Sequence, residues 1–154
     1  METTITTTRE RVFRLVARRM EWQGTRSGKD SDLYGRIAIS EADNSLLHNL
    51  FDEASMHAID ICRPFLISVS NTENALTLRL SPNACRDEAA EATLGSAITG
   101  MLAAHVLAQW QEIVSPERAA ASYSKRDDYA SKVQSILYHH PAPVRQPTTR
   151  QPKQ

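Results

Sequence analysis

The sequence is short of cysteine, glycine and aromatic residues and carries no net charge, and several of these shortages exclude a class of protein. Two cysteines among 154 residues cannot form the disulfide framework of a small secreted scaffold, and the polar, Thr-rich first residues do not resemble a signal peptide. The 5 glycines form no phosphate-binding or dinucleotide-binding loop. Because 18 basic residues balance 18 acidic ones, no global field attracts nucleic acid or an anionic membrane. We therefore expect a chain made in a reducing cytoplasm, without a common catalytic motif.

Size and composition are those of one globular domain. Apolar residues make up 41% of the chain and charged residues 23%, values that argue against disorder, a membrane bundle or a fibre. The periodicity predicts a mainly α-helical domain over 1–140, with four helices and one accessory β-hairpin between the second and third helices. The segment 141–154 is rich in proline and basic residues, and we expect a flexible tail without a core of its own.

The first two predicted helices differ in charge. Thr7 as N-cap and Glu10 three residues later form a capping box, which predicts a first helix of about fourteen residues with a basic outer face. Two glycines among polar residues predict an exposed loop over 23–32. Ser40 is the expected cap of a second helix, which ends at Arg63 because Pro64 cannot continue the hydrogen-bond ladder.

The second half of the chain contains the hairpin and the most apolar helix. Alternating apolar residues over 65–81, with turn residues at Asn71-Thr-Glu-Asn74, predict one β-hairpin. From Ala92 to Gln111 the chain has no charged residue, yet several polar ones argue against a membrane span and favour the buried central helix of a bundle. Ser115-Pro116-Glu117 predicts the start of a last helix that ends near Tyr138.

Small residues recur every four positions along the predicted central helix. They are Ser96, Gly100, Ala104 and Ala108. Small side chains let a neighbouring backbone approach closely, and that neighbour is either a helix of the same chain or a second subunit.

Histidines and cysteines do not form a predicted catalytic or metal site. His48 and His57 are nine residues apart, which places them on opposite faces of one helix, so they cannot share an ion within one copy. Cys62 and Cys85 have no base nearby in the sequence, and buried cysteines usually behave as small apolar residues. We therefore predict a protein that is not an enzyme and has no metal, cofactor or catalytic residue.

Charge is unevenly distributed along the neutral chain. The first forty residues hold eight basic and five acidic side chains, whereas Glu41 to Asp60 contains five acids and no Lys or Arg. Three interpretations stay open: a solvated face paired with the acidic second helix, a contact between subunits, or a nucleic-acid contact. The candidate interface residues are Arg11, Arg14, Arg18, Arg19, Asp52, Glu53, Ser96, Gly100, Ala104, Arg145, Arg150 and Lys153.

The order of these predicted elements resembles a known family. Together with Ala97-Ile-Thr-Gly-Met-Leu-Ala-Ala-His-Val-Leu-Ala-Gln-Trp110, Tyr34-Gly-Arg-Ile37 and Tyr138, it is similar to the head–tail connector (adaptor, or head-completion) proteins of tailed bacteriophages. The resemblance covers residues 9–145 and rests on layout. It implies a structural virion protein, made in the host cytoplasm, whose copies form a ring on the portal. Other neck or tail proteins would be its partners, and DNA would pass through the ring without specific binding. The alternative is a small DNA-binding or regulatory module that uses the basic face of the first helix.

Overall fold

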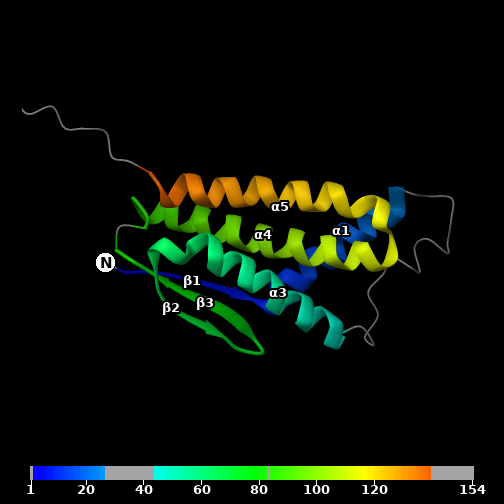
Figure 1. Cartoon of the computed structure of the whole chain (residues 1–154), viewed down its shortest axis with the longest axis horizontal. Helices are drawn as coiled ribbons and strands as arrows, with labels where there is room; N and C mark the ends of the chain where they lie inside the picture. Colours follow the sequence, from blue (N-terminus) through cyan, green and yellow to red (C-terminus); the bar gives the residue numbers. More distant parts are fainter. Residues whose placement is uncertain (1, 27–43, 83, 140–154) are drawn as a thin grey trace, which may run out of the picture.

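The computed structural model describes residues 2–26, 44–82 and 84–139 of the chain. Within these residues the fold is mainly helical, as predicted, and the predicted hairpin is part of a small three-stranded antiparallel sheet. The elements follow the order β1 (Thr3–Thr8), α1 (Arg9–Arg26), α3 (Asn44–Cys62), η2 (Arg63–Phe65), β2 (Leu66–Asn71), β3 (Ala75–Leu80), α4 (Glu88–Val114) and α5 (Pro116–Leu137). Figure 1 shows α4 and α5 side by side along the longest axis, with the sheet on the opposite side of α4 from α5.

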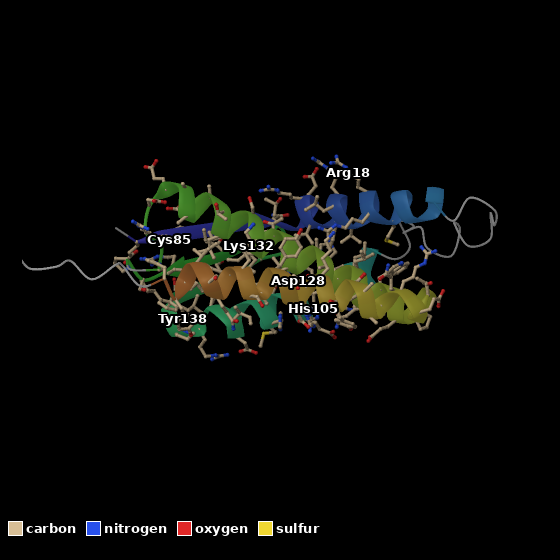
Figure 2. The ribbon with its side chains drawn as sticks, turned by 90° about the horizontal axis from the view of Figure 1, so that it is seen from above. Arg18, Cys85, His105, Asp128, Lys132 and Tyr138 are labelled. Atoms are coloured by element: carbon tan, nitrogen blue, oxygen red, sulfur yellow. The ribbon has the colours of Figure 1, made fainter. Side chains whose placement is uncertain are left out.

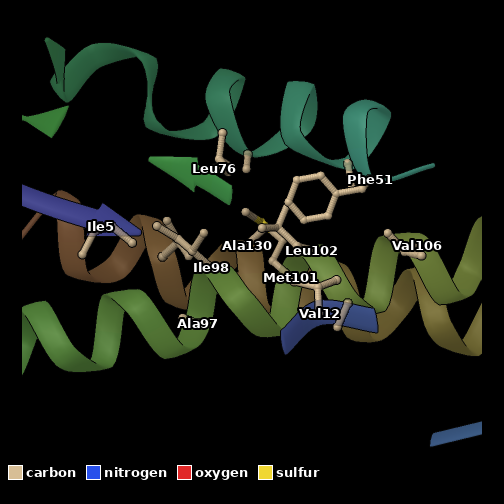
Figure 3. Close-up of a cluster of buried hydrophobic side chains, with 14 of the residues drawn as sticks. Ile5, Val12, Phe51, Leu76, Ala97, Ile98, Met101, Leu102, Val106 and Ala130 are labelled. Carbon is tan, nitrogen blue, oxygen red and sulfur yellow. The ribbon is translucent and has the colours of Figure 1, made fainter. Parts of the chain in front are cut away.

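Helix α4 is the centre of the core. Every residue from Ala97 to Ala108 is buried, which confirms the predicted burial for this part of the uncharged run, whereas Ala92, Thr93 and Ser96 near its start are exposed. Figure 3 shows side chains from every neighbouring layer converging on it. They include Ile5 of β1, Val12 of α1, Phe51 of α3, Leu76 of β3 and Ala130 of α5.

Strand β1 was not predicted, and it changes the start of the first helix. The prediction that Thr7 caps this helix is wrong, because Thr7 lies in β1 and its hydroxyl contacts that of Thr99 at 3.1 Å. The hydroxyl of Thr8 instead accepts a hydrogen bond from the Arg11 backbone at 3.3 Å. Only Ile5 is apolar in this strand, so the usual alternation of apolar and polar residues is absent.

Two predicted boundaries also change. Helix α1 continues to Arg26, so residues 23–26 are helical and not part of an exposed loop. Residues 27–32 and the predicted cap Ser40 lie outside the described residues. Helix α3 ends at Cys62, and Pro64 lies in the short helix η2 that follows.

The predicted hairpin is present as β2 and β3, and β3 is the central strand of the sheet. Its order is β1-β3-β2, so β1 and β2 are both edge strands. The register of β1 on β3 is regular over six residues, whereas β2 has an irregularity between Leu66 and Ser68. The buried side chains of β3 face the helices, while Thr4, Thr6 and Arg79 are exposed.

Helices α4 and α5 approach closely at Gly100. A Cβ atom built on Gly100 would lie 2.6 Å from Cε1 and 2.7 Å from Cζ of Tyr129 in α5. At Gly95 the nearest side-chain atoms belong to Ile5 and are 3.9 Å away, an ordinary contact. The small residue at 100 is therefore required by packing within the chain, and the one at 95 is not.

These two glycines give a matched pair of substitutions. Gly100→Ala should lower the free energy of unfolding by about 1–2 kcal/mol, because overpacking outweighs the better helix propensity of alanine. Gly95→Ala should raise it by about 0.5–1 kcal/mol, because only the propensity changes. Urea unfolding followed by far-UV circular dichroism measures both. Equal effects of the two substitutions would contradict the close approach at Tyr129.

Candidate interaction surfaces

The basic face predicted for the first helix is present on α1. Arg11, Arg14 and Arg18 are exposed, and Figure 2 shows Arg18 pointing outward at one side of the molecule. Arg14 donates to Glu10 at 2.6 Å, one turn earlier. Arg11 and Arg18 form no ion pair with a side chain that the structure describes. The outer face of α1 therefore keeps positive charge available for another molecule.

Arg19 belongs to a different environment. It is half-buried, its Nη2 donates to the Tyr129 hydroxyl at 3.4 Å, and its guanidinium lies 6.0 Å from the centre of the Tyr129 ring. This candidate interface residue therefore packs α1 against α5.

The acidic residues of α3 are bonded within the chain. Asp52 accepts a hydrogen bond from Arg9 at 2.6 Å, and Asp60 accepts one from Arg63 at 2.6 Å. Glu53 accepts a hydrogen bond from Gln109 of α4. Asp52 and Glu53 were candidates for a contact with another subunit, but both already hold neighbouring elements of the same chain.

Arg9, unlike the other arginines of α1 predicted to be exposed, is buried at the junction of three elements. Its Nη2 donates to Asp52 Oδ1 at 2.6 Å and to Asn71 Oδ1 at 3.0 Å, and Nε donates to the Thr72 carbonyl at 3.0 Å. The Nη1 atom lies 3.0 Å from His48 Nδ1, and the guanidinium stacks 4.5 Å from the centre of the Phe51 ring. Arg9 therefore joins the start of α1 to α3 and to the hairpin turn.

An acidic surface that was not predicted from the sequence occurs where α4 begins. Asp87 caps the helix by accepting a hydrogen bond from the Ala90 backbone at 2.8 Å. Glu88 and Glu91 follow in the first turn, where the positive end of the helix dipole favours acidic groups. Both line an open groove of about 530 Å³ between α4 and the outer edge of β1. An exposed acid in a first helical turn is common, so the sequence alone gave no signal for this surface.

The small residues of α4 divide between the core and the surface. Gly100, Ala104 and Ala108 are buried, and Gly100 contacts α5 of the same chain. The close approach that small residues allow therefore takes place within the chain, and neither Gly100 nor Ala104 is available to a second subunit. Ser96 is exposed.

A second buried polar cluster joins α3, α4 and α5. The rings of His57 and His105 are 5.4 Å apart, and Arg126 Nη1 lies 3.2 Å from His105 Nδ1. Arginine can only donate, so His105 accepts at Nδ1 and carries its proton on Nε2. Burial and then the charge of Arg126 lower the pKa of His105 to about 4, and burial lowers the pKa of His57.

Arg126 and the two histidines of α3 have distinct surroundings. Arg126 is half-buried and stacks 4.8 Å from the centre of the Tyr123 ring. His48 and His57 do face different surroundings, since His48 contacts Arg9 and Phe13 while His57 contacts His105. No group of three or more possible metal ligands occurs among the described residues.

The two cysteines are poor nucleophiles. Cys62 is buried, and burial raises its pKa to about 11. Burial also raises the pKa of Cys85, which is only partly exposed. The thiolate form of each is therefore disfavoured near neutral pH.

Two further observations bear on the candidate surfaces. None of the helices in 2–26, 44–82 and 84–139 combines the length and apolar content needed to cross a membrane. The candidate residues Arg145, Arg150 and Lys153 lie outside the described part of the chain.

Comparisons with protein-family models, with curated proteins and with solved structures found no match to this chain.

Proposed function

We propose that this chain is a non-enzymatic assembly protein of a tailed-phage particle, a head–tail connector subunit that binds copies of itself, the portal and other neck or tail proteins. It would be made in the host cytoplasm and reside in the virion. The protein would work by binding its partners through complementary surfaces, and no cofactor would take part.

The order of elements supports this role. The resemblance to connector proteins rests on a helix, a second helix, a hairpin, a buried helix and a last helix in that sequence. The structure has these elements in that order, with β1 in addition.

Opposite charge on the surface of one subunit is the observation that carries the proposal. The basic face of α1 and the acidic start of α4 are both exposed, while the acids of α3 are bonded within the chain. Complementary charges steer association and fix how two subunits align. A protein whose work is to bind its own copies needs such surfaces.

One observation favours the alternative, a small DNA-binding or regulatory module. Arg11, Arg14 and Arg18 share one exposed helix face, and arginines in that arrangement can follow a line of phosphates. The start of α4 lies along the same side of the molecule (Figure 2), and Glu88 and Glu91 in its first turn would repel the phosphate backbone.

Light scattering on the purified full chain separates the two functions. We expect oligomers, seen as rings in negative-stain images, and Arg14→Glu with Arg18→Glu should reduce assembly while the melting temperature changes by less than about 3 °C. Solvent-exposed charges contribute little to folding, which is the reason for the small thermal effect.

The contrary outcome is equally clear. A monomer that binds duplex DNA at low salt, and loses that binding steeply as salt rises, would replace the connector proposal by the DNA-binding one. A monomer that binds neither DNA nor its own copies would contradict both.

A further inference from the structure

Among the residues that the structure describes, no strand pairs with the outer edge of β1, so the backbone hydrogen-bonding groups at that edge have no strand partner. The Arg9 N–H donates to the Asn74 carbonyl at 2.9 Å, which continues the ladder between β1 and β3. Hydrogen-bonded pairs alternate along an antiparallel ladder, so the odd-numbered residues of β1 bond to β3. The N–H and C=O groups of Thr4 and Thr6 therefore point to the open edge.

This edge lacks the features that usually prevent strand pairing. Natural edge strands are protected by proline, lysine, inward charges or bulges. The six residues of β1 are five threonines and one isoleucine, all β-branched, and their register is regular. The opposite edge strand, β2, has an irregularity between Leu66 and Ser68. Of the two edges, β1 is the one suited to accept another strand.

Charges flank the β1 edge with opposite sign at its two ends. Figure 2 shows the start of α4, β1 and α1 along one side of the molecule and α3 along the other. Glu88 and Glu91 lie beside the strand, and the basic face of α1 follows directly after its last residue. Rotation by 180° about an axis through the middle of the edge exchanges the acidic end and the basic end.

We infer that β1 pairs with β1 of a second copy in antiparallel orientation, which makes one continuous six-stranded sheet across a two-fold axis. Thr4 would pair with Thr6 of the partner subunit through the backbone groups that β3 leaves free. In this antiparallel arrangement, the partner's α1 begins beyond the first residue of β1, near the acidic start of α4. Arg11 and Arg14 of the partner subunit then face Glu88 and Glu91, once on each side of the axis.

This inference rests on the proposed function only in requiring that copies of the chain bind one another. A two-fold contact closes at two copies, so a connector ring would need another contact as well. Dimer formation through β1 and ring formation can therefore succeed or fail separately.

A charge-reversal experiment with two full-length variants tests the contact. One variant carries Arg11→Glu and Arg14→Glu, and the other carries Glu88→Lys and Glu91→Lys. Each variant alone should dissociate at least about tenfold more readily than the unmodified dimer, because both copies of the contact become repulsive. A mixture of the two should form a heterodimer, because both contacts are then attractive again. Sedimentation equilibrium gives the dissociation constants, and circular dichroism checks that each variant is folded.

Proline substitutions test the strand pairing itself. Thr6→Pro removes an N–H that points to the open edge and should abolish the dimer while β1 keeps its bonds to β3. Val69→Pro is the matched control. The Thr72 N–H donates to the Ala75 carbonyl at 2.9 Å, so by the same alternation the Val69 N–H points away from β3 at the other edge. This control should leave the dimer unchanged.

Several results would overturn the inference. They are a chain that stays monomeric at millimolar concentration, a mixture of charge variants that fails to pair, or equal effects of Thr6→Pro and Val69→Pro. If rings form that the charge variants disturb but Thr6→Pro leaves unchanged, the β1 contact is wrong while the proposed function stands. If no self-association occurs under any condition, the proposed function fails together with the contact.

Discussion

Arg9→Ala should lower the free energy of unfolding by about 3 kcal/mol, one of the two largest effects that we expect from a single side chain. The Arg9 side chain is 8% exposed, and its guanidinium bonds to Asp52, Asn71 and the Thr72 carbonyl. Removing one partner of a buried ion pair costs about 3–5 kcal/mol. We expect the lower end of this range, because the Asp52 side chain is 53% exposed and water can replace the lost bond.

Two comparisons show whether the burial of Arg9 is responsible. Arg11→Ala removes an exposed arginine from the same helix and should change stability by less than about 0.5 kcal/mol. Arg9→Lys keeps the charge but lacks the planar fork that reaches several acceptors, so it should recover only part of the loss. Urea unfolding measures all three. An effect of Arg9→Ala below about 1 kcal/mol would show that the junction is held by its apolar contacts alone.

The elements predicted correctly are those with a local signal. Helix α5 begins at Pro116, because proline is pre-organised for the first helical position and Glu117 follows in the first turn; the Ser115 hydroxyl bonds to Glu117 and caps no backbone N–H. The hairpin follows from a change of period and from turn residues between its strands. The core run of α4 is visible as an absence of charge. Each of these signals lies within one continuous stretch of the chain and needs no knowledge of the rest of the fold.

The features that were not predicted, strand β1 and the burial of Arg9, depend on contacts between segments far apart in the sequence. Strand β1 exists because β3, far along the chain, supplies its ladder, and Thr3 and Thr7 are buried only in that arrangement. Arg9 resembled the other basic residues of the first helix until the hairpin turn and α3 enclosed it. A run of six β-branched residues was the one available hint of β1.

The candidate surfaces were predicted in part for the same reason. Periodicity placed Arg11, Arg14 and Arg18 on an exposed face, which the structure confirms. Periodicity could not show that Asp52 and Glu53 are bonded within the chain, or that Gly100 contacts Tyr129. Whether a polar or small residue is free for a partner depends on which element of its own chain reaches it first.

Acid should destabilise the fold through His105, and this is the second large effect that we expect. Burial lowers the folded-state pKa from 6.5 to about 4, so between these values the unfolded chain binds a proton that the folded chain does not. Well above pH 6.5 the ring is neutral in both states and contributes no pH dependence. As the pH falls toward 4, the free energy of unfolding should decrease by about 1.4 kcal/mol per pH unit, which amounts to about 3 kcal/mol. His57, whose pKa is also lowered, acts in the same direction.

The geometry of the cluster explains why the proton is unfavourable. Protonated at both nitrogens, His105 can no longer accept the hydrogen bond from Arg126, and two cations then lie 3.2 Å apart beside His57. Asp127, which is bonded to Arg126 and raises the pKa of His105, offsets only part of this cost. His105→Asn keeps an acceptor for Arg126 but does not titrate. Between pH about 7 and about 4.5, this variant should lose about 2 kcal/mol less stability than the unmodified chain, as measured by urea unfolding at each pH. Identical losses would mean that the acid sensitivity of the fold comes from its carboxylates and not from this buried histidine.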